Sequence, residues 1–217
     1  EARREHILRT TRAQWLLRPG SSPGVVDLQA LVPMAASSLS PSPLPDDLAY
    51  VLFTSGTTGL PKGVEITRRG LHNYLNWAAR HYRIERLHGA VAQLNAGFDA
   101  SITQLLLPVL SGRSVHVVSP GDEITGMATM LRRADVAWLL KLTPSQVHAL
   151  GVELGPEYAS NAAGELVLGG EALDVNTATM ARRMFPHYVI HNEYGPTETV
   201  VGSTVYVLSS EQLSESV

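Results

Sequence analysis

Cysteine is absent from the 217 residues, which excludes disulfides, zinc–thiolate centres and a cysteine nucleophile. Long apolar runs are absent too, because none approaches the roughly 18 residues that a membrane-spanning helix needs. The opening Glu1-Ala-Arg-Arg-Glu-His is too charged for a signal peptide. We therefore expect a cytoplasmic protein with no membrane partner.

An excess of positive charge is also lacking. The formal net charge of −3 gives no electrostatic reason to expect nucleic acid as a partner. A hydrophobic share of 44% and a charged share of 17% are typical of a globular protein. The length allows one or two domains with a substantial core.

A stretch rich in glycine and hydroxyl groups follows a short apolar run. Tyr50-Val-Leu-Phe53 predicts the end of a buried strand, and six of the seven residues from Thr54 to Leu60 are glycine, serine or threonine. Glycines let backbone N–H groups point into one concavity, the hydroxyls add donors, and Lys62 adds a cation. The pattern indicates a polyphosphate site, although Lys62 lies too far from the last glycine for a Walker loop. The alternative is a flexible surface loop.

The run Leu48-Ala-Tyr-Val-Leu-Phe-Thr-Ser-Gly-Thr-Thr-Gly-Leu-Pro-Lys-Gly-Val64 resembles the phosphate-binding signature of the adenylate-forming superfamily, in the spelling of nonribosomal peptide synthetase adenylation domains. In that family the loop holds the β- and γ-phosphates of ATP. The resemblance implies this role for Thr54, Ser55, Gly56, Thr57, Thr58, Gly59 and Lys62, with Thr54 and Lys62 also catalytic. One departure is Arg68, where relatives usually have histidine; it bears on substrate entry.

The rest of the chain alternates between apolar runs typical of strands and amphipathic stretches typical of helices. Strands are expected at 64–67, 114–119, 136–142, 165–170, 188–191 and 204–208, and helices at 70–82, after 101, and at 122–134, 143–151 and 176–185. This order favours an α/β fold of mainly parallel sheets flanked by helices. Nearer the start we expect a surface helix at 1–13, short strands at 14–17 and 25–32, and a proline- and serine-rich linker at 37–47.

Two further stretches begin where a predicted strand ends, which is where α/β folds bind ligands. They are Gly169–Ala172 and Asn192–Glu198. Tyr194 offers a ring face to a purine base, and Glu198 is a hard oxygen ligand suited to magnesium. A simple turn with a first-turn carboxylate explains the second stretch equally well. By resemblance these stretches bind adenine and magnesium, which implies ATP contacts by Gly170, Glu171, Ala172, Asn192, Glu193, Tyr194, Gly195 and Thr197, magnesium binding by Glu198, and catalytic roles for Thr197 and Glu198.

Asp99 has two interpretations. It lies just before a strong helical pattern, so it can be an N-cap, which stabilises a helix by about 1 kcal/mol. It can also be a carboxylate at the floor of a pocket that binds a cation. Phe98-Asp-Ala-Ser101 resembles the family's substrate motif, whose aspartate binds the α-ammonium group of an amino acid. The resemblance therefore points away from fatty and aryl acids.

Other residues fall on the positions that line the family's substrate pocket: Ala100, Thr103, Lys141, Val167, Gly169, Glu193, Val201 and Gly202. Lys141 and Glu193 are the charged members, and burying either charge alone would be costly. Together they can satisfy each other and clamp a side-chain amide, with the lysine donating and the glutamate accepting. The set is similar to the pattern of asparagine-activating domains, with Ala100 in place of the usual leucine. The alternative is that Lys141 points to solvent or pairs structurally.

The resemblance implies a fragment of the large N-terminal core subdomain of an adenylation domain. We divide it into a peripheral part, 1–45, and an ATP- and substrate-binding core, 46–217. Relatives continue into a ribose-binding aspartate, a hinge and a small C-terminal subdomain, so we expect the isolated polypeptide to be inactive or very weak. The implied reaction makes an aminoacyl-adenylate, which passes to the phosphopantetheine thiol of a carrier protein. The rival interpretations are an acyl-CoA synthetase and a non-catalytic nucleotide-binding remnant.

Overall fold

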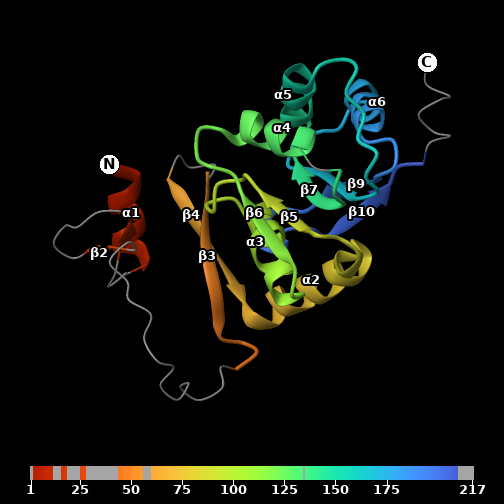
Figure 1. The fold of residues 1–217 in the computed structure, drawn as a ribbon. Helices are drawn as coiled ribbons and strands as arrows, with labels where there is room; N and C mark the ends of the chain where they lie inside the picture. Colours follow the sequence, from red (N-terminus) through yellow and green to blue (C-terminus); the bar gives the residue numbers. More distant parts are fainter. Residues whose placement is uncertain are drawn as a thin grey trace.

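The computed structural model describes residues 2–11, 16–18, 25–27, 44–55, 60–133 and 135–209, with the backbone alone for 16–18 and 25–27. A six-stranded sheet in the order β10-β9-β8-β7-β5-β6 forms its centre (Figure 1). The strands are β5 (Gly89–Ala92), β6 (Ser114–Val117), β7 (Trp138–Leu142), β8 (Glu165–Gly169), β9 (Val189–Tyr194) and β10 (Thr204–Val207). Neighbouring strands are parallel except β9 and β10. The expected α/β class is confirmed.

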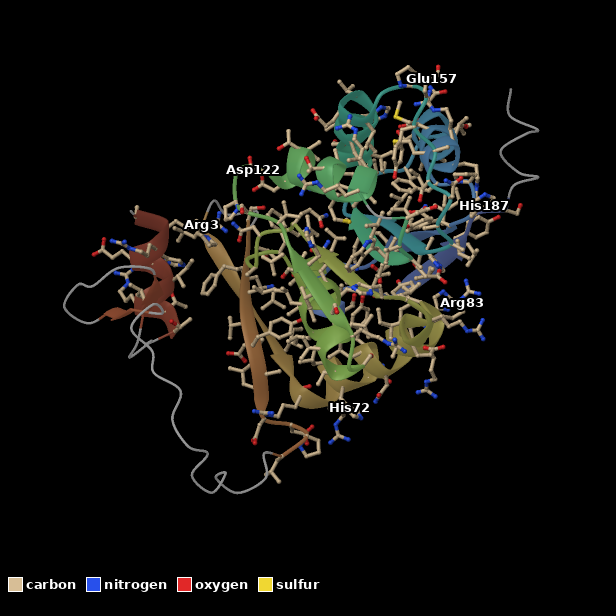
Figure 2. All side chains as sticks on the ribbon, in the orientation of Figure 1. Arg3, His72, Arg83, Asp122, Glu157 and His187 are labelled. Atoms are coloured by element: carbon tan, nitrogen blue, oxygen red, sulfur yellow. The ribbon has the colours of Figure 1, made fainter. Side chains whose placement is uncertain are left out.

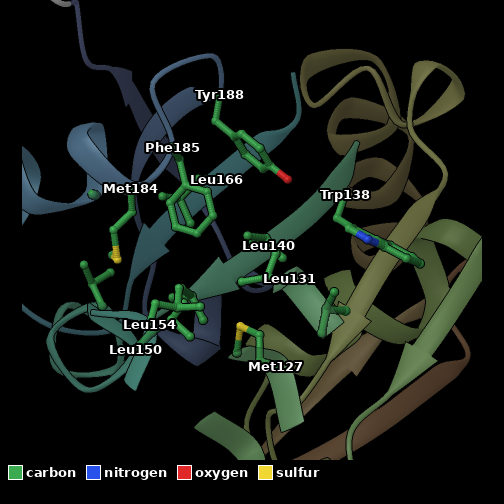
Figure 3. Packing of buried hydrophobic residues seen from close by; sticks show 14 of the residues in the cluster. Met127, Leu131, Trp138, Leu140, Leu150, Leu154, Leu166, Met184, Phe185 and Tyr188 are labelled. Atoms are coloured by element: carbon green, nitrogen blue, oxygen red, sulfur yellow. The ribbon is translucent and has the colours of Figure 1, made fainter. Parts of the chain in front are cut away.

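Helices cover both faces of this sheet. They are α2 (Arg68–His81), α3 (Ala100–Leu110), α4 (Glu123–Arg133), α5 (Pro144–Leu154) and α6 (Val175–Met184). Because side chains alternate between the two faces of a strand, each central strand supplies two cores. Leu140 and Leu166 face a core shared with α4, α5 and α6, whose packing Figure 3 shows. Leu139 and Val167 face the core under α2 and α3.

The described residues of the phosphate-loop stretch lie in a separate antiparallel pair of strands, β3 (Leu48–Ser55) and β4 (Pro61–Thr67). The second strand begins at Pro61, three residues earlier than expected, so Lys62 lies within a strand. The expected buried strand is only half-buried from Tyr50 to Phe53, because β3 pairs with β4 alone among the described residues.

The N-terminal part forms the surface helix that the sequence predicted, α1 (Ala2–Thr11), with no buried residue. Two short strands, β1 (Leu16–Arg18) and β2 (Val25–Asp27), pair in parallel. The remainder of the predicted second strand, 28–32, and most of the predicted linker, 37–43, lie outside the described residues. No helix in the described ranges is long and apolar enough to cross a membrane.

Two local predictions were wrong, each for a tertiary reason. The central strand β5 was missed because its four small residues carry neither alternation nor a strong apolar signal. Helix α5 does not end at Gly151 but continues to Leu154 and is capped by Gly155 at φ +87°. A Cβ on Gly151 would lie 2.8 Å from the sulfur of Met180, so this glycine serves helix packing.

Candidate active site

A cavity of about 320 Å³ opens beyond the carboxyl ends of β7, β8 and β9. This size falls within the range of small-molecule sites. Residues expected at the site line much of it: Asp99, Ala100, Lys141, Gly169, Gly170, Glu171, Glu193, Gly195 and Val201. Sequence reasoning did not anticipate the rest of the lining, which is Leu94, Phe98, Leu142, Thr143 and Gln146.

Asp99 occupies the N-cap position of α3, but its side chain makes no capping hydrogen bond. Its Oδ2 atom is buried and has no hydrogen-bond partner among the described residues. Burial raises the pKa of the Asp99 carboxyl, while a hydrogen bond from Thr197 and the charge of Lys141 oppose the rise. A partly buried carboxylate with a spare oxygen is a site for a cation that brings its own hydrogen-bond donors.

The inner wall of the cavity holds an ion pair between Lys141 on β7 and Glu193 on β9. Both side chains are buried, at 4% and 3% exposure, so neither of the two points to solvent. The register places Lys141 beside Val167 and Glu193 beside Gly169 on the intervening strand β8. Both side chains therefore project from the face that α2 and α3 cover.

Glycines allow the Glu193 segment to pack closely. A Cβ on Gly169 would lie 2.7 Å from the backbone oxygen of Glu193. A Cβ on Gly202 would overlap the Glu193 carboxylate itself. Both glycines therefore leave room for the neighbouring strand and its carboxylate. Packing alone explains why these positions are glycine, whether or not they also contact a ligand.

Two hydroxyl groups on the α2 side hold the carboxylate of Glu193. Tyr82 and Tyr74 donate to Glu193 Oε1 over 2.9 and 3.1 Å. Neither tyrosine was among the residues that the sequence predicted for the site. The missed signal is that buried tyrosines usually require a polar partner. Thr103, whose side chain is fully buried on α3, bonds to Lys141 Nζ at 3.2 Å.

Buried glutamines fix the backbone of the same wall, and these were also missed. The Nε2 atoms of Gln93 and Gln104 donate to the carbonyl oxygen of Lys141 over 2.7 and 2.9 Å. Gln104 also donates to Gln93 Oε1 over 2.8 Å. Two donors on one carbonyl hold β7 in register with α3 beside the cavity.

The start of α5 forms another side of the cavity. Thr143 and Gln146 make a reciprocal capping box. Glu171 accepts hydrogen bonds from the backbone N and the hydroxyl of Ser145 over 2.9 and 2.6 Å. These bonds lower the pKa of the Glu171 carboxyl. They also hold the segment after β8 against the N-terminus of α5.

A second buried polar group lies one row further along the same face of the sheet. Glu165 accepts from His191 over 2.6 Å and from Arg83, which lies at the edge of the molecule in Figure 2. All the oxygens of Glu165 are thereby engaged, so this group stabilises the sheet beneath the cavity.

The Asn192–Glu198 stretch differs from the loop that the sequence predicted, because β9 continues to Tyr194. Pairing with β10 extends it, matching Asn192 with Tyr206 and Tyr194 with Thr204. Glu193 alone of the three strand residues faces the cavity, since its neighbours project from the opposite face. Tyr194 is 71% exposed and does not line the cavity.

The 3-10 helix η3 (Thr197–Thr199) carries the remaining residues of this stretch. Thr197 joins it to the cavity through the hydrogen bond to Asp99, whereas Glu198 is exposed. Val200 and Val201, which follow, have φ of 66° and 67°. Left-handed backbone is costly for β-branched residues, so local packing holds this turn, with Val201 buried against the cavity.

Among the expected phosphate-binding residues, the three that the structure describes, Thr54, Ser55 and Lys62, do not line this cavity. Thr54 and Lys62 lie opposite each other on β3 and β4, and Ser55 ends β3. Lys62 is exposed, and residues 56–59 lie outside the described residues. Their assignment to ATP stays a prediction. A wider groove of about 1,050 Å³ lies along the outer face of α2, and it contains none of the expected site residues.

The sequence matches the family model described as AMP-binding enzyme over residues 3–217. The chain therefore belongs to the AMP-binding enzyme family. It is 38% identical over 173 residues to bacitracin synthase 3 of Bacillus licheniformis, which covers 79% of this chain and 3% of that protein. It is 31% identical over 216 residues to tyrocidine synthase 3 of Brevibacillus parabrevis, covering 96% of this chain and again 3% of the relative.

Among solved structures, the fold is similar to that of an NRPS protein containing adenylation and PCP domains, with a TM-score of 0.79 and 24% identity. The match covers 98% of this chain and 43% of that one. At this identity the likeness shows the fold, and it agrees with the predicted α/β architecture. The family that the Leu48–Val64 signature indicated is confirmed.

Proposed function

We propose that the natural protein carrying this sequence activates an amino acid with ATP, and that asparagine is its preferred substrate. Asp99 carries the proposal, because this carboxylate lines the cavity and keeps one buried oxygen without a partner among the described residues. The α-ammonium group of an amino acid supplies both the donors and the compensating charge that such an oxygen requires. Fatty and aryl acids supply neither.

The preference for asparagine rests on the Lys141–Glu193 pair at the inner wall. The two opposite charges cancel, so the wall favours a neutral polar side chain. The carboxylate of aspartate would be repelled by Glu193, which disfavours this close isostere of asparagine. Ala100 lines the same cavity and leaves room for a somewhat larger side chain.

In the proposed reaction the amino-acid carboxylate attacks the α-phosphorus of ATP, which forms an acyl–phosphate bond and releases pyrophosphate. The acyl group then passes to the phosphopantetheine thiol of a carrier protein, and AMP leaves. Positioning and charge neutralisation are sufficient for the first half, so no side-chain nucleophile is required. The similar solved protein contains both adenylation and PCP domains, which supports the second half.

Magnesium would accompany ATP. Within the described ranges no group of three or more histidine, aspartate or glutamate side chains could hold a metal ion by itself. One exposed carboxylate, Glu198, fits a magnesium ion that keeps water and phosphate oxygens as its other ligands. The bound ion would neutralise phosphate charge. The residues from Thr54 to Lys62 and from Asn192 to Thr197 are proposed to hold the nucleotide.

The test is acid-dependent pyrophosphate exchange by the natural protein, with asparagine, aspartate, glutamine, a fatty acid and an aryl acid compared. We expect the greatest exchange with asparagine. Asp99→Asn should abolish it, whereas Asp122→Asn, an exposed control outside the cavity, should not. Preference for an acid without an α-amino group would favour an acyl-CoA synthetase. ATP binding without any acid-dependent exchange would favour a non-catalytic nucleotide-binding protein.

A further inference from the structure

Five side chains at the inner wall form one closed hydrogen-bonded group, here called the Glu193 network: Tyr74, Tyr82, Thr103, Lys141 and Glu193. Each of these side chains belongs to a residue that is at most 5% exposed. They come from four elements far apart in the sequence, with α2 and its C-cap supplying the two tyrosines. Lys141 and Glu193 line the cavity, whereas Tyr74 and Tyr82 belong to the core under α2 and α3.

The hydrogen atoms of the network can be assigned from the bonding rules of each group. An ammonium has three donors, and Lys141 Nζ has three acceptors: Glu193 Oε2, Thr103 Oγ1 at 3.2 Å and Tyr74 Oη at 3.4 Å. A carboxylate only accepts, so both phenols donate to Glu193 Oε1. Because Tyr74 donates its one hydroxyl hydrogen to Glu193, Thr103 must be the donor in the 2.6 Å bond between the hydroxyls of Thr103 and Tyr74.

This assignment uses every polar hydrogen of the network internally. Burial and the charge of Glu193 raise the pKa of both phenols, so they remain neutral donors. Glu193 Oε1 is saturated by two donors, while Oε2 accepts from Lys141 alone among the described residues and keeps acceptor capacity. Toward a ligand in the cavity the network therefore presents an acceptor and no free donor.

We propose that Tyr74 and Tyr82 are specificity-positioning residues, which hold Glu193 as an acceptor and keep the Lys141 hydrogens away from the cavity. The wall then selects a neutral side chain that donates a hydrogen bond, such as a primary amide, and rejects a carboxylate. This inference rests on the proposed amino-acid activation. It adds residues outside the expected pocket positions and a mechanism for discriminating asparagine from aspartate.

The two tyrosines have separable effects. The bond from Lys141 to Tyr74 is the longest that the ammonium makes, so Tyr74 holds the most weakly bound hydrogen. Tyr74→Phe frees this hydrogen for a ligand and removes one donor from Glu193. Tyr82→Phe removes one donor from Glu193 without freeing a hydrogen of Lys141. Only the first change gives an acceptor side chain something to bind.

The experiment compares asparagine and aspartate, whose side chains differ by one NH₂ group, in pyrophosphate exchange by the natural protein. For Tyr74→Phe we expect the ratio of kcat/KM for asparagine to that for aspartate to fall at least tenfold. For Tyr82→Phe we expect a several-fold rise in the KM for asparagine with a smaller change in the ratio. Tyr188→Phe, which alters a buried tyrosine in the other core, is the matched control and should leave the ratio unchanged.

Thr103→Val provides an independent test, because it also frees a Lys141 hydrogen while preserving side-chain shape. It should lower the asparagine-to-aspartate ratio as Tyr74→Phe does. A folded Tyr74→Phe protein and a folded Thr103→Val protein that both retain the natural ratio would overturn the inference alone. A natural protein that prefers aspartate to asparagine would also overturn it. Absence of any amino-acid-dependent exchange in the natural protein would overturn the proposed function, and this inference with it.

Discussion

Lys141 and Glu193 form an ion pair across strand β8, although 52 residues separate them in the sequence. Beside this pair the intervening strand places Val167 and Gly169, and the missing side chain of Gly169 lets β9 approach closely. Two opposite charges are thereby held at the wall of the cavity and shielded from water.

The first prediction concerns the energetic role of the pair. Lys141→Met keeps the length of the side chain but leaves the Glu193 carboxylate buried without its cation. Removing one partner of a buried pair typically costs about 3–5 kcal/mol, and we expect a loss of that size in the free energy of unfolding. Urea unfolding measures it.

Lys62→Met is the matched control, because Lys62 is exposed on β4, and its effect should stay within about 0.5 kcal/mol. Combining Lys141→Met with Glu193→Gln should recover part of the loss, since the uncompensated charge is removed. Equal stability of the Lys141→Met and Lys62→Met proteins would contradict a buried pair at this position.

The second prediction concerns Gly202, which lies against the carboxylate of Glu193. A Cβ at this position would overlap Oε1 and lie 2.8 Å from Cγ of Glu193, so Gly202→Ala must displace that side chain. We expect a loss of about 1–3 kcal/mol in the free energy of unfolding, together with a higher KM for asparagine. Urea unfolding and pyrophosphate exchange on the same protein measure the two effects.

Gly97→Ala provides the comparison, since Gly97 lies in an exposed loop and its Cβ would meet only the side-chain oxygen of Asn95 at 3.2 Å. It should change the free energy of unfolding by less than Gly202→Ala does. If Gly202→Ala left both stability and KM unchanged, the position of the Glu193 carboxylate would have to differ from the one described.

The third prediction is a pH dependence of stability with a definite sign. Burial raises the pKa of the Asp99 carboxyl above its ordinary value of 3.8. At a pH between the ordinary pKa and the raised pKa of the folded state, the folded protein keeps a proton that the unfolded chain has released. The contribution of Asp99 to stability therefore falls as pH rises. Asp99→Asn should therefore raise the thermal unfolding midpoint at pH 7, and the difference should shrink toward about pH 4.

Asp174→Asn should show the opposite sign. Asp174 caps α6, and hydrogen bonds from Thr177 lower the pKa of its carboxyl. The charged form is favoured in the folded state, so the asparagine variant should unfold at a lower temperature at pH 7, with a difference that fades as pH falls. A lower thermal unfolding midpoint for Asp99→Asn than for the natural protein at pH 7 would show that the charge of Asp99 does not destabilise the fold.

Much of the fold could be predicted from local pattern. Runs such as 138–142 and 165–169 are mostly apolar because both faces of their strands are buried, and this marked them as members of a parallel sheet. The start of α5 followed from a local cap at Thr143. The pattern failed at β5, where four small buried residues form a central strand, and at Gly151, whose role depends on Met180 in another helix.

The candidate site was predictable only in part. Lys141, Glu193 and Asp99 were named because they fall on substrate-pocket positions of the family that the sequence resembles. Tyr74 and Tyr82 could not be assigned, since a buried tyrosine has the same helical spacing whether it fills space or donates to a carboxylate. Gln93 and Gln104 were missed for a similar reason, because their common acceptor is a backbone carbonyl on β7.

The sequence by itself determined the family, the α/β class and the order of the central helices and strands after β5, because these depend on short-range spacing and on one contiguous signature. Tertiary structure alone decided which charges meet and which hydrogens remain free. Lys141 reaches Glu193 only because strand register and side-chain alternation place both on the face that α2 covers. Such pairings link residues tens of positions apart, and no local pattern contains them.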